Sequence, residues 1–225
     1  MEKGNFYKQN RDAFLTAILS VVYLTWFFLL ERHVTNNYHI IHVALDDYIP
    51  FCEYFIVPYL LWFGYVFVFC AYFYKRERVI FRKLIAFLFI GMFSALLFCT
   101  IYPNGTDFRP AVDPDKNVFS ALVYALYGVD TPTNVLPSIH VYNSLAIQIA
   151  VMQSETLRKY QYLRGISLVL CVLICMATVF LKQHSVVDVF AAGVMAYAVY
   201  GAVYGAGYAA ETDTQTARAE NERLL

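Results

Sequence analysis

The stretch GISLVLCVLICMATVFLKQHSVVDVFAAGVMAYAVY, residues 165–200, decides the architecture of this chain. It holds two long apolar runs, and only Lys182, Gln183 and His184 lie between them. A helix needs about 20 apolar residues to cross the hydrocarbon core of a bilayer. The pattern therefore predicts two membrane-spanning helices joined by a tight turn, with a carboxylate, Asp188, inside the second helix.

Composition supports the same interpretation for the whole chain. Of its 225 residues, 60% are hydrophobic and 18% aromatic, and the mean hydropathy is +0.50, whereas soluble domains average about 45–50% apolar residues. We therefore expect one all-α, polytopic membrane domain over residues 1–210, followed by a polar, disordered cytoplasmic tail at 211–225. Because the formal net charge is zero, no nucleic-acid partner is expected.

Six apolar spans are long enough to be transmembrane helices. They lie at 13–30, 55–74, 84–101, 135–152, 165–181 and 185–210. The fourth span carries His140 near its start and the sixth carries Asp188; ionisable residues are costly inside a membrane and are therefore functional candidates. Between the third and fourth spans, the apolar stretch 118–127 predicts a short helix at the membrane surface.

Lys and Arg are distributed unevenly over the segments that join these spans. Thirteen of the 17 fall on one face, and the positive-inside rule assigns that face to the cytoplasm. Both termini are therefore expected to be cytoplasmic, and the reactive polar residues fall on the opposite face. The residues of the cytoplasmic face are Lys3, Lys8, Arg11, Lys75, Arg76, Arg78, Arg82, Lys83, Arg158, Lys159, Arg164, Arg218 and Arg223.

His184 and Asp188 open the last span. Because they are four residues apart, they lie on one face of a helix and can touch. A carboxylate bonded to one imidazole nitrogen fixes the tautomer and leaves the other nitrogen free to attack an electrophile. The pair therefore predicts a catalytic dyad, with two alternatives: a polar contact that packs two helices, or a metal site.

The sequence Pro137-Ser138-Ile139-His140 opens the fourth span. Proline suits the first turn of a helix, and Asn134 is the expected N-cap. Free N–H groups at such a helix start can hold a phosphate, Ser138 adds a hydroxyl donor, and a protonated His140 can give a proton to a leaving alkoxide. The alternative is a histidine that only hydrogen-bonds a loop carbonyl.

Two cations complete the candidates on the outer face. Arg109 offers a planar fork of donors that matches phosphate oxygens, and Lys182, two residues before His184, adds positive charge. The alternative for Arg109 is an interfacial arginine that binds lipid headgroups. The five cysteines fit no metal or disulfide pattern, and neither a metal nor a cofactor is expected.

In this order, the residues resemble the type 2 phosphatidic acid phosphatase superfamily of membrane lipid phosphatases and phosphotransferases. The motifs of that family are Lys-(six residues)-Arg-Pro, Pro-Ser-Gly-His, and Ser-Arg-(five residues)-His-(three residues)-Asp. They are matched here by Arg109-Pro110, Pro137-Ser138-Ile139-His140 and His184-Ser185-Val186-Val187-Asp188. The motifs cover the third to sixth spans, and the six-span layout extends the resemblance to the whole chain.

The resemblance implies a role for each matched residue. His184 would be the nucleophile that forms a phosphohistidine, Asp188 would orient it, and His140 would protonate the leaving group. Arg109 and Ser138 would hold phosphate oxygens. No metal would be required.

The chain departs from the family motifs at three places. Tyr102 stands where the first motif has lysine, Ile139 replaces the glycine of the second, and Ala177-Thr178 replaces the Ser-Arg of the third. Two phosphate-binding cations are therefore absent, and Tyr102 and Lys182 are the expected substitutes at the phosphate. Similar reduced motifs occur in the branch that resembles inositol phosphorylceramide and sphingomyelin synthases, which pass the phosphoryl headgroup to an alcohol.

The expected function is that of a multi-pass enzyme of the plasma or inner membrane that hydrolyses a lipid phosphate at the outer leaflet. Lipid phosphate and membrane lipids are its expected partners. Phosphotransfer between lipids or alcohols is the first alternative, and a non-catalytic transporter or scaffold is the second. The third is a metal site formed by His140, His184 and Asp188, joined by His39 or His42.

Overall fold

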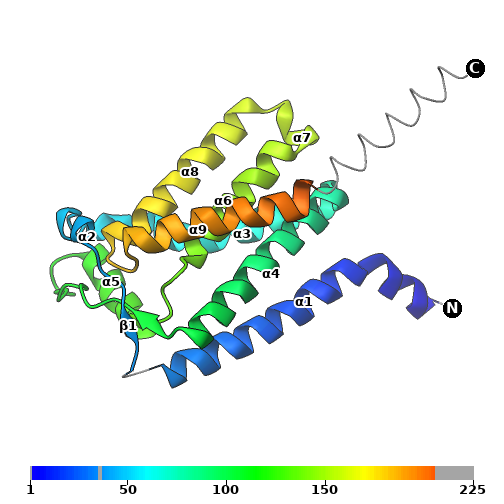
Figure 1. Ribbon diagram of the computed structural model, residues 1–225. Helices are drawn as coiled ribbons and strands as arrows, with labels where there is room; N and C mark the ends of the chain where they lie inside the picture. Colours follow the sequence, from blue (N-terminus) through cyan, green and yellow to red (C-terminus); the bar gives the residue numbers. More distant parts are fainter. Residues whose placement is uncertain (1, 35–36, 206–225) are drawn as a thin grey trace, which may run out of the picture.

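The computed structural model describes residues 2–34 and 37–205, and these residues are mostly helical (Figure 1). The helices are α1 (Glu2–His33), α2 (Ala44–Tyr48), α3 (Ile56–Arg76), α4 (Arg78–Ile101), α5 (Val118–Val129), α6 (Ile139–Gln153), α7 (Glu155–Arg158), α8 (Gln161–Phe180) and α9 (Val186–Tyr200). A short helical turn, Glu53–Phe55, precedes α3, and another, Gly201–Gly205, follows α9. The predicted tail, 211–225, lies outside the described residues.

Five helices are long and apolar enough to cross a membrane. They match the first, second, third, fifth and sixth predicted spans. Their bounds are Asn10–His33, Glu53–Arg76, Arg78–Ile101, Gln161–Phe180 and Val186–Gly205. Ile18, Phe67 and Phe190 on these helices are 60%, 73% and 74% exposed. Since extended apolar surface is rare on soluble proteins, these helices are compatible with an integral membrane protein.

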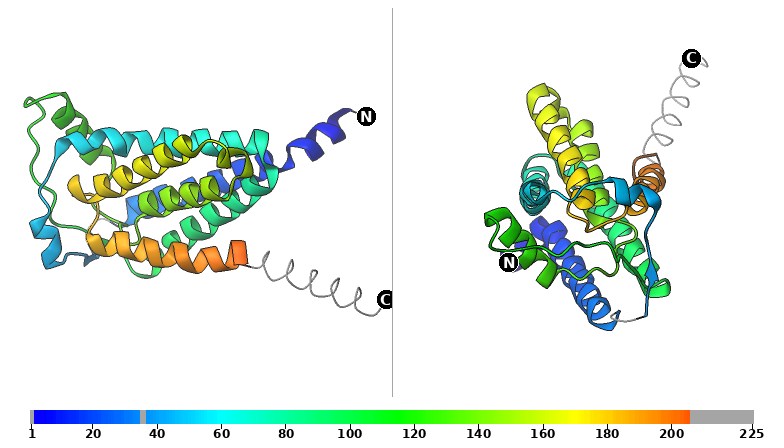
Figure 2. Two further views of the ribbon diagram at one scale, coloured as in Figure 1. Left: turned by 90° about the horizontal axis from the view of Figure 1, so that it is seen from above. Right: turned by 90° about the vertical axis from the view of Figure 1, so that its left-hand side faces the viewer.

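The fourth predicted span differs from the other five. Its helix, α6, has 15 residues and begins four residues later than the predicted span, 135–152. It lies in the middle of the bundle, packed against α3, α4, α8 and α9 (Figure 2). Tyr142, Ile147 and Val151 are fully buried along it. Because its neighbours surround it, α6 contributes to the core and has little exposed surface.

A buried hydrogen-bond chain connects α3, α6 and α8. The Ser167 hydroxyl donates to Gln148 Oε1 over 2.6 Å, and the Tyr65 hydroxyl lies 2.8 Å from Ser167 Oγ. An unsatisfied polar group inside an apolar core is costly, so these three side chains satisfy one another. Polar contacts of this kind fix the relative positions of helices whose other contacts are apolar.

The predicted tight turn between the last two helices is confirmed. Residues 181–185 join α8 to α9, and Lys182 has a left-handed backbone with φ 53°. The N–H groups of Gln183 and His184 both donate to the Thr178 carbonyl at 3.0 Å. The turn therefore folds back onto the end of α8, and this fixes the direction of His184.

At the same end of the molecule, two loops meet in a short parallel pair, β1 (His39–Ile40) and β2 (Asn104–Gly105), with His39 opposite Asn104. This pair is the departure from an all-α fold within the described residues. The Asn104 side chain is fully buried, and its Oδ1 accepts from the N–H groups of Val135 and Leu136 at 2.9 Å each. Asn104 therefore holds the extended segment that leads into α6.

The predicted short helix at 118–127 is also present, as α5. It extends two residues further, to Val129. Asn117 is its N-cap, and its Oδ1 accepts from the Ser120 N–H at 2.9 Å. Val123 on α5 is fully buried in a small apolar cluster with Tyr59 of α3, so α5 covers the end of the bundle.

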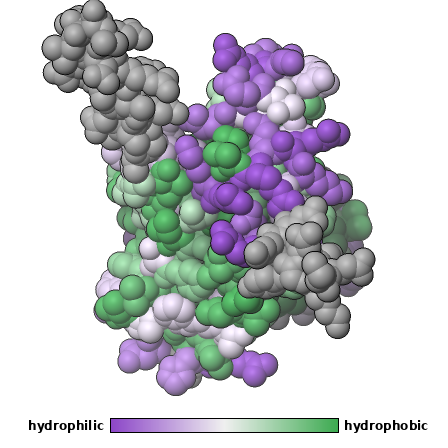
Figure 3. Space-filling model, turned by 90° about the vertical axis from the view of Figure 1, so that its right-hand side faces the viewer, coloured by the Kyte–Doolittle hydropathy of each residue, from purple (hydrophilic) through white to green (hydrophobic). Residues whose placement is uncertain are grey.

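The opposite end of the molecule is polar. Figure 3 shows hydrophilic residues over this end, bordered by hydrophobic surface. Lys75, Arg76 and Arg78 lie there, where α3 passes into α4. The candidate site residues and the basic residues between α3 and α4 therefore lie at different ends of the helices.

Close approach between α4 and α6 depends on Gly91. A Cβ added there would lie 2.0 Å from Cζ of Tyr142, and Tyr142 is held because its hydroxyl donates to the Phe87 carbonyl at 2.7 Å. We expect Gly91→Ala to lower the free energy of unfolding by about 1–3 kcal/mol, as other overpacked core substitutions do. Thermal unfolding in detergent measures this.

The matched control is Gly64→Ala. Gly64 lies in α3, and an added Cβ there meets no heavy atom within 4 Å. Alanine is the better helix former, so this variant should be at least as stable as the wild type. Equal stability of the two variants would contradict the close packing of α4 on α6.

Candidate active site

The candidate residues come from distant parts of the chain and meet at one end of the bundle, the left-hand end in Figure 1. His184 lies in the turn before α9, and His140 lies in the first turn of α6. Arg109 lies in the loop between β2 and α5. The site is thus built where two helices begin and where the longest loop closes over them.

His184 and Asp188 are in contact, as their spacing predicts. Nδ1 of His184 lies 3.2 Å from Oδ2 of Asp188, and the carboxylate is fully buried. The same Oδ2 accepts from the Ser185 N–H at 3.0 Å, so Asp188 is also part of the N-terminal cap of α9. Because a carboxylate only accepts, this contact favours the tautomer with the proton on Nδ1, in which Nε2 has the free lone pair.

A second carboxylate, Asp46, reaches the same turn from the short helix α2. Its Oδ2 accepts from the Ser185 hydroxyl at 2.6 Å, and its Oδ1 accepts from the Val186 N–H at 2.9 Å. Asp46 is almost fully buried. It therefore satisfies the first amide of α9, that of Val186, and connects α2 to the candidate dyad.

His140 faces His184, with 5.9 Å between the ring centroids. Its ring lies against Tyr59 and Trp62 of α3, at centroid distances of 4.6 and 4.4 Å. Its Nδ1 is buried and has no hydrogen-bond partner among the described residues. Because buried polar atoms in proteins nearly always have a partner, the unpaired nitrogen beside a second histidine makes His140 a candidate functional residue.

The start of α6 corrects one detail of the sequence interpretation. The N-cap is Ser138, whose Oγ accepts from the Val141 N–H at 3.5 Å, and not Asn134, which has a left-handed backbone with φ 57°. Pro137 therefore precedes the helix. Ser138 is fully buried, and its N–H donates to the Asp188 carbonyl at 3.2 Å, so it joins the starts of α6 and α9.

Arg109 is held by acceptors on several sides. Its Nη1 donates to the Asp130 carbonyl at 2.6 Å, and its Nη2 donates to the Thr131 carbonyl at 3.1 Å and to the side-chain oxygen of Gln183. Its Cζ lies 4.7 Å from the centre of the Tyr127 ring. Burial lowers the pKa of Arg109 from its ordinary value, but a guanidinium stays protonated in proteins. Arg109 is therefore a fixed positive charge.

A small cavity joins these groups. It has a volume of about 40 Å³, enough for about one water molecule. Arg109, His140 and His184 line it together with two carboxylate residues, Glu31 and Asp130. The Glu31 carboxylate accepts from the Thr131 hydroxyl at 2.8 Å. A phosphate group would need part of this wall to move.

An apolar groove adjoins the cavity. Its volume is about 520 Å³, and it shares Glu31, Asp130 and His140 with the cavity. Its walls come from α1, α3 and α5, and they include Phe28 and Phe63, which are 58% and 59% exposed. The groove therefore leads from His140 to the apolar outer surface of the helices.

Lys182 has other partners in this structure. Its Nζ donates to the Asp46 carbonyl at 2.6 Å and to the Ile49 carbonyl. It is not among the described residues that line the small cavity, and neither are Ser138 and Tyr102. The structure thus brings His184, Asp188, His140 and Arg109 together and holds the Lys182 ammonium against the C-terminal part of α2.

Two further histidines, His39 and His42, contact residues outside the small cavity. His39 stacks on Tyr102, with ring centroids 4.2 Å apart. His42 lies 2.8 Å from Asp47 and 3.3 Å from Asp107, and its hydrogen bond to Asp47 raises its pKa. Among the described residues, no three histidine, cysteine or acidic side chains gather as metal ligands do.

Several residues of the site have no assignment from sequence. Asp46, Glu31, Asp130 and Gln183 carry polar groups that contact the candidates or line the cavity. Glu31 closes an apolar run and Gln183 lies in a turn, and both are common positions for solvated polar residues. The partners of these residues come from segments that are distant in the sequence, so their contacts exist only in the folded chain.

Comparisons with protein-family models, curated proteins and solved structures found no match to this chain. The interpretation of the site therefore depends on its geometry and on the motifs in its sequence.

The role of Asp46 can be tested against its neighbour. In Asp46→Asn, one acceptor oxygen becomes an amide nitrogen that faces either the Ser185 hydroxyl or the Val186 N–H. A buried donor left without an acceptor costs about 1–3 kcal/mol, and thermal unfolding should show a loss of that size. Asp47→Asn is the control, because Asp47 is exposed and should change stability little. An equal loss of stability in Asp47→Asn would contradict a specific role of Asp46 at the start of α9.

Proposed function

We propose that this protein is a membrane enzyme that removes the phosphate from a lipid phosphate through a phosphohistidine on His184. The observation that carries the proposal is the buried His184–Asp188 pair, with His140 facing it and Arg109 on the same cavity. A pair that only packs helices gives no reason for a second histidine and a fixed cation to face it. The resemblance to the type 2 phosphatidic acid phosphatase superfamily implies the same chemistry.

In the first half-reaction, Nε2 of His184 attacks phosphorus, and the P–N bond forms as the bond from phosphorus to the lipid oxygen breaks. Asp188 stabilises the positive charge that develops on the ring through the Nδ1–H. Protonated His140 gives its proton to the leaving alkoxide. Arg109 stabilises the negative charge on the phosphoryl oxygens.

In the second half-reaction, neutral His140 takes a proton from a water molecule as the water oxygen attacks phosphorus. The P–N bond breaks and inorganic phosphate leaves. His184 returns to its neutral state, and His140 is protonated again. Each histidine therefore ends the cycle as it began.

The proposal includes six crossings, with α6 as the central one, and cytoplasmic termini. The basic residues at the end of the bundle opposite the site support this orientation. The site then faces the non-cytoplasmic side. The apolar groove supports a lipid substrate, because its exposed phenylalanines would contact the bilayer and its inner end reaches His140.

Phosphotransfer from a phosphodiester to an alcohol is the second candidate, and the charge of the cavity favours it. Glu31 and Asp130 bring two carboxylates to a cavity in which Arg109 is the fixed cation. A phosphomonoester dianion would be repelled more strongly than a phosphodiester, which carries one charge less at phosphorus. A headgroup that bears an amine would be attracted to the same carboxylates.

The first experiment offers the purified protein, in detergent with EDTA, a panel of lipid phosphates and phosphodiesters with and without alcohol acceptors. Mass spectrometry follows free phosphate and new lipids. We expect His184→Ala to abolish turnover, and Asp188→Asn to slow it by about 10²–10⁴-fold, as loss of the orienting carboxylate does in other histidine sites. His33→Ala is the control, because this exposed histidine lies at the end of α1.

Wild-type rates in both His184→Ala and Asp188→Asn would reject the nucleophile. A chelator-sensitive rate would favour the metal alternative. The absence of turnover on the whole panel would favour the transporter or scaffold.

A separate variant tests the charge of the cavity. Glu31→Gln removes a negative charge while keeping an oxygen for the Thr131 hydroxyl. We expect the rate on phosphatidic acid to rise relative to phosphatidylcholine by roughly tenfold, about 1.4 kcal/mol. Glu155→Gln, an exposed change on α7, is the control. If Glu31→Gln slows both substrates equally, Glu31 has a structural role and does not discriminate between headgroups.

A further inference from the structure

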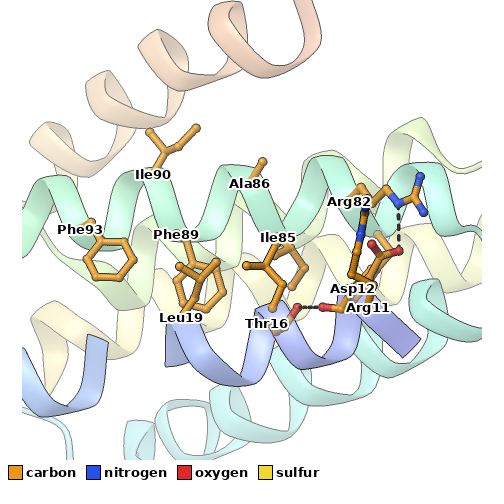
Figure 4. Close-up of a pocket in the computed structure, with 12 residues that line it drawn as sticks. Arg11, Asp12, Thr16, Leu19, Arg82, Ile85, Ala86, Phe89, Ile90 and Phe93 are labelled. Atoms are coloured by element: carbon orange, nitrogen blue, oxygen red, sulfur yellow. Dashed lines mark hydrogen bonds and ion pairs between the residues drawn. The ribbon is translucent and has the colours of Figure 1, made fainter. Parts of the chain in front are cut away.

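A second groove lies between α1 and α4, away from the candidate site (Figure 4). Its volume is about 600 Å³. Phe81, Ile85 and Phe89 of α4 form a buried floor, while Leu15 and Ile90 on its rim are 52% and 45% exposed. The groove is thus an apolar channel open to the surroundings of the helices.

Charged and apolar groups are separated along this groove. Figure 4 shows Arg11, Asp12 and Arg82 together at one end and Phe93 at the other. From Phe81 to Phe93, α4 rises by about 18 Å, which is close to the depth of one leaflet of a hydrocarbon core about 30 Å thick. A lipid acyl chain therefore matches the groove in length as well as in polarity.

The polar end of the groove carries a positive charge. The Asp12 carboxylate is already paired, since Nε of Arg82 lies 2.8 Å from its Oδ2. Among the residues whose side chains the structure describes, 10–34 and 37–205, none accepts a hydrogen bond from the Nη groups of Arg82 or from the Arg11 guanidinium. Two guanidiniums against one carboxylate leave one positive charge and a set of planar donors that suit phosphate oxygens.

We propose that this groove binds a negatively charged phospholipid, with one acyl chain along α4 and the phosphate between Arg11 and Arg82. A zwitterionic lipid would make the same apolar contacts but would leave the positive charge unbalanced. Because α1 packs chiefly against α4, the bound lipid would bridge the two helices and hold α1 on the bundle. The proposal does not depend on the chemistry at His184.

The test records thermal unfolding of the full chain in detergent as phosphatidylglycerol or phosphatidylcholine with the same acyl chains is added. We expect phosphatidylglycerol to bind more tightly by roughly fivefold for the one unbalanced positive charge and to raise Tm further. The double variant Arg11→Gln/Arg82→Gln should lose the difference between the lipids. Arg158→Gln, which removes an exposed cation on α7 outside the groove, should keep it.

A second variant separates lipid binding from folding, because Arg82→Gln also breaks the pair with Asp12. Ala86 is exposed in the groove, so Ala86→Phe fills the space without changing charge. It should unfold as cooperatively as the wild type and gain less from phosphatidylglycerol. Equal stabilisation by both lipids in the wild type, an undiminished effect in Ala86→Phe, or the same loss in Arg158→Gln would each overturn the proposal.

Discussion

Helix α9 begins inside the protein, where its first amide groups must find acceptors without help from bulk water. Two carboxylates meet this need from different directions. Asp188 accepts from the Ser185 N–H, and Asp46 accepts from the Val186 N–H and the Ser185 hydroxyl. Negative charge is also favoured at the positive end of a helix dipole. Because the His184 ring shares the Asp188 carboxylate, the interaction that begins the helix also orients the proposed nucleophile.

Three consecutive side chains of the turn before α9 contact three different partners. Lys182 donates to carbonyls in and just after α2, Gln183 accepts from Arg109, and His184 contacts Asp188. The left-handed backbone of Lys182 makes this divergence possible, since a continuous helix would place neighbouring side chains about 100° apart on one cylinder. The segment around Asp46 and the loop that carries Arg109 are therefore hydrogen-bonded to the turn that holds His184. The site depends on all three segments.

How much of this is predictable from sequence depends on whether a feature is local. Apolar runs predict six spans, of which five are long apolar helices in the structure; they also predict the turn between α8 and α9, and a spacing of four predicts the contact of His184 with Asp188. The start of α6 is not local, because Asn104 binds the backbone just before it and the cap moves from Asn134 to Ser138. The partners of Lys182 and Asp46 lie more than 130 residues away in the chain. No rule based on residue spacing predicts contacts over that separation.

The cavity at the histidines holds about one water molecule, so the proposed reaction requires a wall to move. Of the helices that line the cavity, α1 packs chiefly against one other helix, α4, whereas α6 is enclosed by four helices. In the proposed bilayer, lipid chains are as apolar as the side chains they would replace, so the main cost of a small displacement of α1 would be the hydrogen bonds that Glu31 accepts from Thr131 and Asn134. Such a displacement would carry Glu31 away from the cavity and widen the groove beside His140. Under the two proposals, α1 is therefore the element that the substrate and the bound anionic lipid share.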